Sequence, residues 1–172
     1  MQCDLIHLLK VRTEMFKKYL IVFLISMVPI VELRGAVPFG TGMSLPWYWV
    51  LIIAMVGNML PVPFIFLFGR RILEWGSRFE NKFGAFFRWC LDKGHRGGKK
   101  LTEKAGQSTY IALLLFVGIP LPGTGAWTGT LAASLLDLDF KKSSISVMGG
   151  VLLAGVIMTI VSLLTKAGIS AF

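Results

Sequence analysis

Long runs of residues without charge place the strongest constraint on how this chain can fold. No Asp, Glu, Lys or Arg occurs in residues 35–69, 105–136 or 143–165, and each run exceeds the roughly 20 apolar residues that a membrane-spanning helix needs. Of the 172 residues, 55% are hydrophobic and 16% are charged, whereas about a quarter of a soluble domain is charged. The mean hydropathy is +0.70. The sequence therefore predicts an all-α integral membrane protein.

The positive charge of the chain lies beside its apolar runs. The formal net charge is +9, and Lys and Arg outnumber Asp and Glu most clearly in residues 70–107. Basic segments next to membrane spans stay in the cytoplasm, so we interpret this charge as membrane-surface charge and expect no nucleic-acid partner. Aromatic residues at helical spacing within 70–107 indicate an amphipathic segment. We expect a multi-pass protein of the cytoplasmic membrane of a prokaryote, with residues 70–107 in the cytoplasm.

One apolar stretch carries two charged residues and several helix breakers. Glu32 and Arg34 lie in the middle of residues that are otherwise free of charge from Tyr19 to Gly69. Charge at membrane depth is costly and usually functional. The helix-breaking residues of the same stretch are Pro29, Gly35 and Pro38. Broken backbone survives at that depth only inside protein or beside water, so this stretch is the first candidate for a functional site.

The second half of the chain repeats this arrangement. The apolar piece 19–31 would reach only about 20 Å as a helix, against a hydrocarbon core of about 30 Å, and 110–119 is shorter still. Each piece leads through a Pro/Gly break to a second short piece and then to a full span, at 46–68 and 145–165. The breakers of the second half are Pro120, Pro122, Gly123 and Gly125. Matching breaks in two halves point to a transporter site at a repeat interface.

Two topologies fit this pattern. If each broken segment is a re-entrant hairpin, the two repeats are inverted and their breaks meet near the midplane; if each segment crosses, the repeats are parallel. Counting positive residues slightly favours parallel repeats, but we favour inverted ones. We predict a single transmembrane domain, 1–172, with a basic N-terminal surface helix, a first repeat, a basic amphipathic linker and a second repeat over 1–18, 19–69, 70–107 and 108–172. The glycine-rich last span is compatible with a homodimer.

Two motifs resemble a known family. VELRGAVPFGTG at residues 31–42 and PLPGTGAWTGTLAA at 120–133 resemble the small multidrug export proteins, a family thought to be related to the DedA superfamily of membrane proteins. The resemblance covers roughly residues 25–165. It implies two inverted re-entrant hairpins facing each other within a ring of transmembrane helices. DedA-like proteins are linked to the movement of polyprenyl phosphate lipid carriers and to proton-motive-force homeostasis.

The resemblance also suggests roles for individual residues. Glu32 and Arg34 occupy the positions of the acidic and basic groups in the first hairpin of the family. DedA proteins usually supply an arginine pair from the second hairpin, where this chain instead has Thr124, Trp127 and Thr128. This departure weakens the assignment of a phospholipid-carrier substrate.

The candidate site residues each have a functional and a structural interpretation. Arg34 is suited to a phosphate oxygen, and Glu32, the only carboxylate at depth, could couple transport to protons; alternatively the two form an ion pair that fixes the hairpin. The other substrate-path candidates are Thr41, Asn58, Thr124, Trp127 and Thr128. The threonines could instead bond carbonyls of their own helices, Asn58 could join helices, and Trp127 could be a lid or packing.

Three functions remain open on the sequence. The first is a transporter or flippase for an anionic lipid or amphiphile, such as a polyprenyl phosphate, with proton coupling. The second is a proton-coupled exporter of cationic drugs, and the third is a membrane scaffold that transports nothing. An enzyme is the least expected class, because no catalytic triad or metal cluster is evident. We expect membrane lipids and protons as partners and no cofactor.

Overall fold

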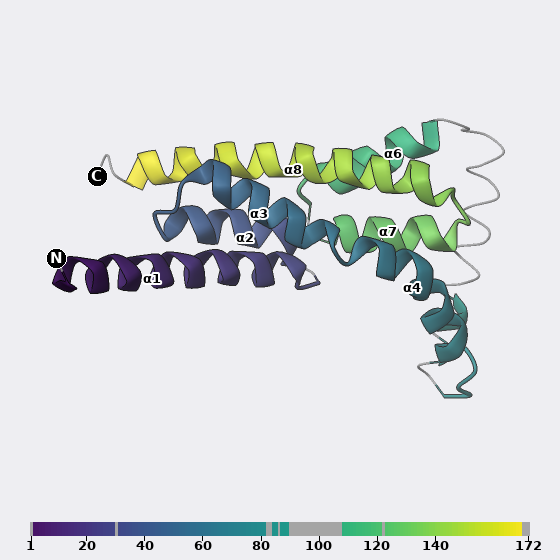
Figure 1. Ribbon diagram of the computed structural model, residues 1–172. Helices are drawn as coiled ribbons and strands as arrows, with labels where there is room; N and C mark the ends of the chain where they lie inside the picture. The colour runs from purple at the N-terminus through teal and green to yellow at the C-terminus, as the bar shows by residue number, and fades with distance from the viewer. Residues whose placement is uncertain are drawn as a thin grey trace. The chain divides into compact units, whose positions relative to one another are not determined.

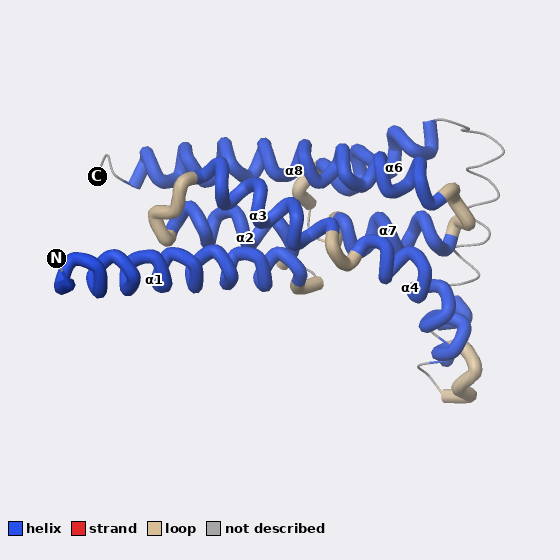
Figure 2. Tube along the Cα trace, in the orientation of Figure 1, coloured by secondary structure: helices blue, strands red, loops and turns tan. Residues whose placement is uncertain are grey.

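The chain is helical wherever its structure is described. A computed structural model describes residues 2–29, 31–81, 84–85, 87–89, 108–121 and 123–169. These residues form helices and loops and contain no strand (Figure 2), which confirms the prediction of an all-α protein. Two stretches, Trp47–Gly69 and Phe140–Gly168, are long and apolar enough to cross a membrane.

The helices belong to two compact units. In chain order they are α1 (Gln2–Met27), α2 (Glu32–Gly42), α3 (Trp47–Met59), α4 (Val62–Gly76), α6 (Ser108–Gly118), α7 (Ala126–Leu135) and α8 (Phe140–Ile169) (Figure 1). The first unit combines Met1–Asn58 with Gly155–Phe172, and the second is Met59–Ala154. The long helix α8 therefore contributes its C-terminal half to the first unit and its N-terminal half to the second.

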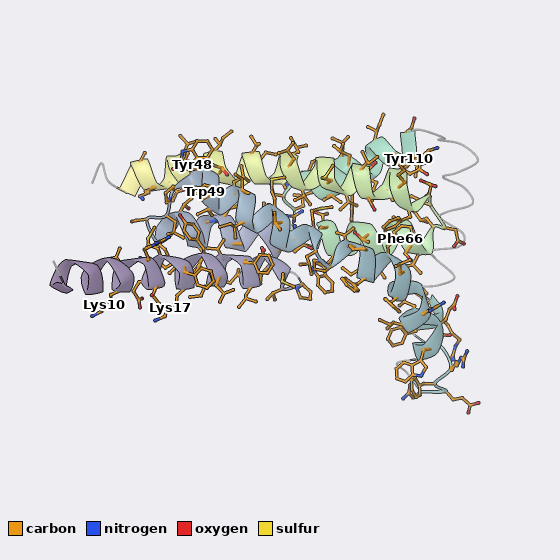
Figure 3. All side chains as sticks on the ribbon, in the orientation of Figure 1. Lys10, Lys17, Tyr48, Trp49, Phe66 and Tyr110 are labelled. Carbon is orange, nitrogen blue, oxygen red and sulfur yellow. The ribbon has the colours of Figure 1, made fainter. Side chains whose placement is uncertain are left out.

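The first unit is built on α1 packed along α2. The basic segment and the apolar piece that follows it form one helix, Gln2–Met27, whereas the sequence predicted a separate surface helix over 1–18. Lys10 and Lys17 project from the side of α1 that faces away from α2 (Figure 3). Close packing in this unit depends on Gly57, because a Cβ at this position would overlap the Oγ of Ser26.

The second unit is built on α7, which packs against both α4 and α6. The hydroxyl of Ser134 on α7 donates a hydrogen bond of 2.8 Å to the carbonyl of Phe66 on α4. The ring of Phe66 also meets that of Phe140 edge-on, with centroids 5.0 Å apart. A helix carbonyl that accepts a second hydrogen bond from a neighbouring helix fixes the register between the two, so Ser134 positions α7 on α4.

The turns that follow α2 and α7 have the same geometry. Ser44 has a left-handed φ of 60° and Asp137 one of 51°. The N–H of the next residue, Leu45, donates to Gly40 O at 3.3 Å, and the N–H of Leu138 donates to the carbonyl five residues before it at 3.1 Å. Both leucines are buried. This is the Schellman closure of a helix C-terminus, in which a left-handed residue is followed by a buried apolar one.

The helix breaks involve fewer residues than the sequence predicted. Gly35 and Pro38 were expected to break the first hairpin, but both lie inside α2, although a proline inside a helix removes one N–H donor and crowds the carbonyl four residues before it. The break itself is confined to the residues around Pro29. The expected full span 46–68 is interrupted near Pro61, where α3 ends and α4 begins.

Other predictions fall partly outside the described residues. Most of the expected basic linker, from residue 90 to residue 107, and Pro122 are not described. Before that point, α4 continues beyond the apolar run through Trp75 to Gly76.

We expect Gly57→Ala to destabilise the first unit. The added methyl group would overlap Ser26 Oγ, which already donates to Phe23 O at 2.7 Å, and overpacking of this kind costs about 1–3 kcal/mol. The control is Gly42→Ala, because a Cβ at Gly42 meets nothing within 4 Å and alanine favours helix. Thermal unfolding in detergent should show a lower Tm for Gly57→Ala alone. Equal melting of the two variants would contradict the packing described.

Candidate functional site

Glu32 is the residue at which the first hairpin turns. It begins α2, is only 4% exposed, and has a left-handed backbone with φ 51°. Its N–H donates to Val28 O at 3.0 Å, and the N–H of Gly35 donates to Val31 O at 3.0 Å. Thus the turn from α1 into α2 is completed within a few residues and leaves the carboxylate at the start of a helix, where unpaired N–H groups favour negative charge.

Arg34 lies two residues further, in the first turn of α2, and is half-buried. On a regular helix, residues two apart do not face each other. The left-handed backbone at Glu32 departs from that geometry, and the charges of Glu32 and Arg34 interact. The hairpin therefore presents a buried acid beside a cation that is the more accessible of the two.

The surroundings of the pair are apolar. Leu33, Ala36 and Val37 form the buried face of α2 and are each at most 1% exposed. Leu33 lies against Gly155 of α8 within the same unit. Apolar packing keeps water away from α2 and strengthens electrostatic interactions along it.

The three candidate threonines bond carbonyls of their own segments. Thr41 Oγ1 donates to Val37 O at 2.9 Å or Pro38 O at 3.0 Å. Thr124 donates to Ile119 O or Leu121 O, and Thr128 donates to Gly125 O. Their hydroxyl protons are used within their own segments, so toward a ligand these residues offer only lone pairs.

The remaining candidates are divided between the two units. Asn58 belongs to the first unit, where it is 2% exposed, and its Oδ1 accepts no hydrogen bond from any described residue. Trp127 is half-buried in α7 of the second unit. Thus the first unit contains the charged pair together with Thr41 and Asn58. The second unit contains Thr124, Trp127 and Thr128.

The connection between α6 and α7 turns on glycines. Gly123 has φ 81° and Gly125 has φ 149°, values that side chains with a Cβ rarely adopt. Pro120 lies in the same connection, after α6 has ended at Gly118. These residues were predicted as breakers, and the structure places them between the two helices.

A helical protein with two apolar stretches long enough to cross a membrane has the composition and helix lengths of a membrane protein. Residues 32–157 match the model of a family described as "Putative small multi-drug export protein". Because the match covers more than half of the chain and both motifs, the chain belongs to the small multidrug export family, as the resemblance predicted. No curated protein and no solved structure matches the chain.

Sequence reasoning did not single out two features of these hairpins. Ser134 joins α7 to α4 through its hydroxyl, and a small polar residue at the second-last position of a helix was the available signal. Nothing in the sequence indicated the left-handed backbone at Glu32, because residues such as glutamate rarely adopt this conformation.

We expect glycine to be better tolerated than alanine at Glu32. Both substitutions remove the carboxylate, but only glycine adopts φ 51° without strain, so Glu32→Gly should be more stable than Glu32→Ala by about 1 kcal/mol. Thermal unfolding of the two purified variants measures this difference.

The matched control is the same pair of substitutions at Glu14, an exposed residue inside α1. There the usual helix preference should make alanine the more stable by about 1 kcal/mol. Greater stability of alanine at both positions would show that Glu32 is not held in the left-handed conformation.

Proposed function

We propose that this chain is a proton-coupled membrane transporter of amphiphilic small molecules, and that Glu32 and Arg34 are its coupling and binding pair. The observation that carries the proposal is the burial of Glu32 at 4% exposure beside a half-buried arginine, on the first turn of a helix. An intramembrane charge pair is a functional site by default. The family to which the chain belongs is described as one of export proteins.

The two hairpins support a transporter built from repeats. With 11 and 10 residues, α2 and α7 each reach about 16 Å, half of the hydrocarbon thickness. Each of the turns after them has a left-handed residue at the same position, Ser44 or Asp137, and the same pattern of hydrogen bonds. We infer that each hairpin is re-entrant and that the two repeats are inverted. We also propose that the protein lies in the inner membrane of a prokaryote and that its residues 70–107 are in the cytoplasm.

Coupling would depend on the closeness of the buried Glu32 to the guanidinium of Arg34. An anionic group that binds Arg34 would compete with the Glu32 carboxylate for the same positive charge, so we propose that substrate binding and proton exchange at Glu32 are linked. Binding and proton movement are then two parts of one equilibrium.

The greater exposure of Arg34 favours an anionic head group. A guanidinium binds phosphate or carboxylate oxygens through two parallel hydrogen bonds, and polyprenyl phosphate carriers are the candidate that the DedA relation suggests. The family description favours a second candidate, export of cationic drugs, in which Glu32 binds a proton and a cation alternately. In that case Arg34 must move away from Glu32 when the drug binds.

Transport by reconstituted protein tests both candidates. We expect wild-type proteoliposomes with an imposed pH gradient to move either labelled polyprenyl phosphate or a lipophilic cation. Glu32→Gln should abolish the dependence on the gradient, and Arg34→Ala should lower movement of the anionic lipid at least tenfold, because it removes charge-assisted hydrogen bonds.

The control is Glu14→Gln, which removes an exposed acid from the same unit. Lys17 Nζ donates to Glu14 Oε1 at 2.8 Å and lowers the pKa of this carboxyl group, so Glu14 stays ionised and should not take part in coupling. Movement of the cation but not of the lipid would establish the drug exporter. If Glu32→Gln lost its fold while wild-type protein moved neither substrate, a scaffold role would replace the proposal.

A further inference from the structure

A cleft lies within the second unit. It has a volume of about 400 Å³ and forms where the C-terminal end of α7 meets α4. The hydrogen bond from Ser134 Oγ to Phe66 O holds the two helices together there. The lining residues used below are Leu67, Arg71, Glu74, Asp137 and Leu138.

The cleft contains charges of both signs. Arg71 is exposed, and its guanidinium makes no hydrogen bond or ion pair with any residue in the described part of the chain. The exposed carboxylates of Glu74 and Asp137 line the same cleft. Leu67 and Leu138 supply an apolar wall. A ligand of one charge would therefore meet repulsion from part of the lining.

The cleft lies at the polar end of its unit. The apolar stretch that includes α4 ends at Gly69, just before Arg71, and the end of α7 lies beside the starts of α6 and α8 (Figure 1). Tyr110 lies at that end (Figure 3). The N–H of Asp139 donates to Tyr110 Oη at 3.4 Å, and Lys142 Nζ lies 5.8 Å from the Tyr110 ring centre. Tyrosine and basic residues gather at the level of lipid head groups.

We propose that this cleft binds the head group of a zwitterionic phospholipid that carries a primary ammonium group. The phosphate would lie on Arg71 and the ammonium near the exposed carboxylates of Glu74 and Asp137. The glycerol and the first methylene groups would lie against Leu67 and Leu138. The site is independent of the Glu32 hairpin and of the transported substrate.

Native mass spectrometry of the full chain with added lipid tests this assignment. We expect phosphatidylethanolamine to be retained at least fivefold more than phosphatidylglycerol. Arg71→Gln should lower its retention about tenfold, since a hydrogen bond to a charged group is lost. The double substitution Glu74→Gln with Asp137→Asn should abolish the preference over phosphatidylglycerol. Phosphatidylcholine, whose quaternary ammonium donates no hydrogen bond, should bind more weakly.

The control is Lys141→Gln, which removes an exposed cation of α8 that does not line the cleft and should leave retention unchanged. If Arg71→Gln does not fold, Arg71→Lys is the substitute. It keeps the positive charge but loses the two parallel donors of the guanidinium, so retention of phosphatidylethanolamine should fall two- to threefold. Equal retention of both lipids by the wild type, or wild-type retention by the Arg71 variants, would overturn the proposal. Full competition by free phosphoethanolamine would assign the cleft to a soluble ligand and would also overturn it.

Discussion

Satisfying the backbone within apolar surroundings is the constraint on which both hairpins depend. Where a helix stops inside such surroundings, its last carbonyls need donors. Here they come from nearby: the N–H of Leu45 closes the end of α2, and the hydroxyl of Thr124 bonds the carbonyls that follow α6. These carbonyls are thus bonded by donors a few residues away in the chain, so they do not need water as a donor.

Glu32 differs from these turns, because it is both charged and strained. Its side chain is buried, and burying a charged group disfavours folding. Its backbone is left-handed, which is also unfavourable for a residue other than glycine. The start of α2 and the charge of Arg34 offset part of that cost. Strain retained at a break in a helix is a reason to infer function, since a glycine or asparagine at this position would make the same turn with less strain.

The sequence was sufficient for an all-helical fold with long apolar stretches and for the family, because these depend on local composition and on two motifs. It was not sufficient for the extent of the breaks. Gly35 and Pro38 continue α2 because the packing of Leu33 and Val37 outweighs local helix preference. Nor could it show that α8 is divided between two units, since that division depends on contacts between residues distant in the chain.

The two units have the same turn but not the same chemistry. When Ser44 is aligned with Asp137, Glu32 falls opposite Gly125 and Arg34 opposite Trp127. The second hairpin thus makes its turn with glycine and without charge, and the polar groups beside this turn are the hydroxyls of Thr124 and Thr128. In the transporter proposed above, the coupling pair belongs to the first unit and the proposed lipid site to the second. The two proposed sites therefore share no charged residue.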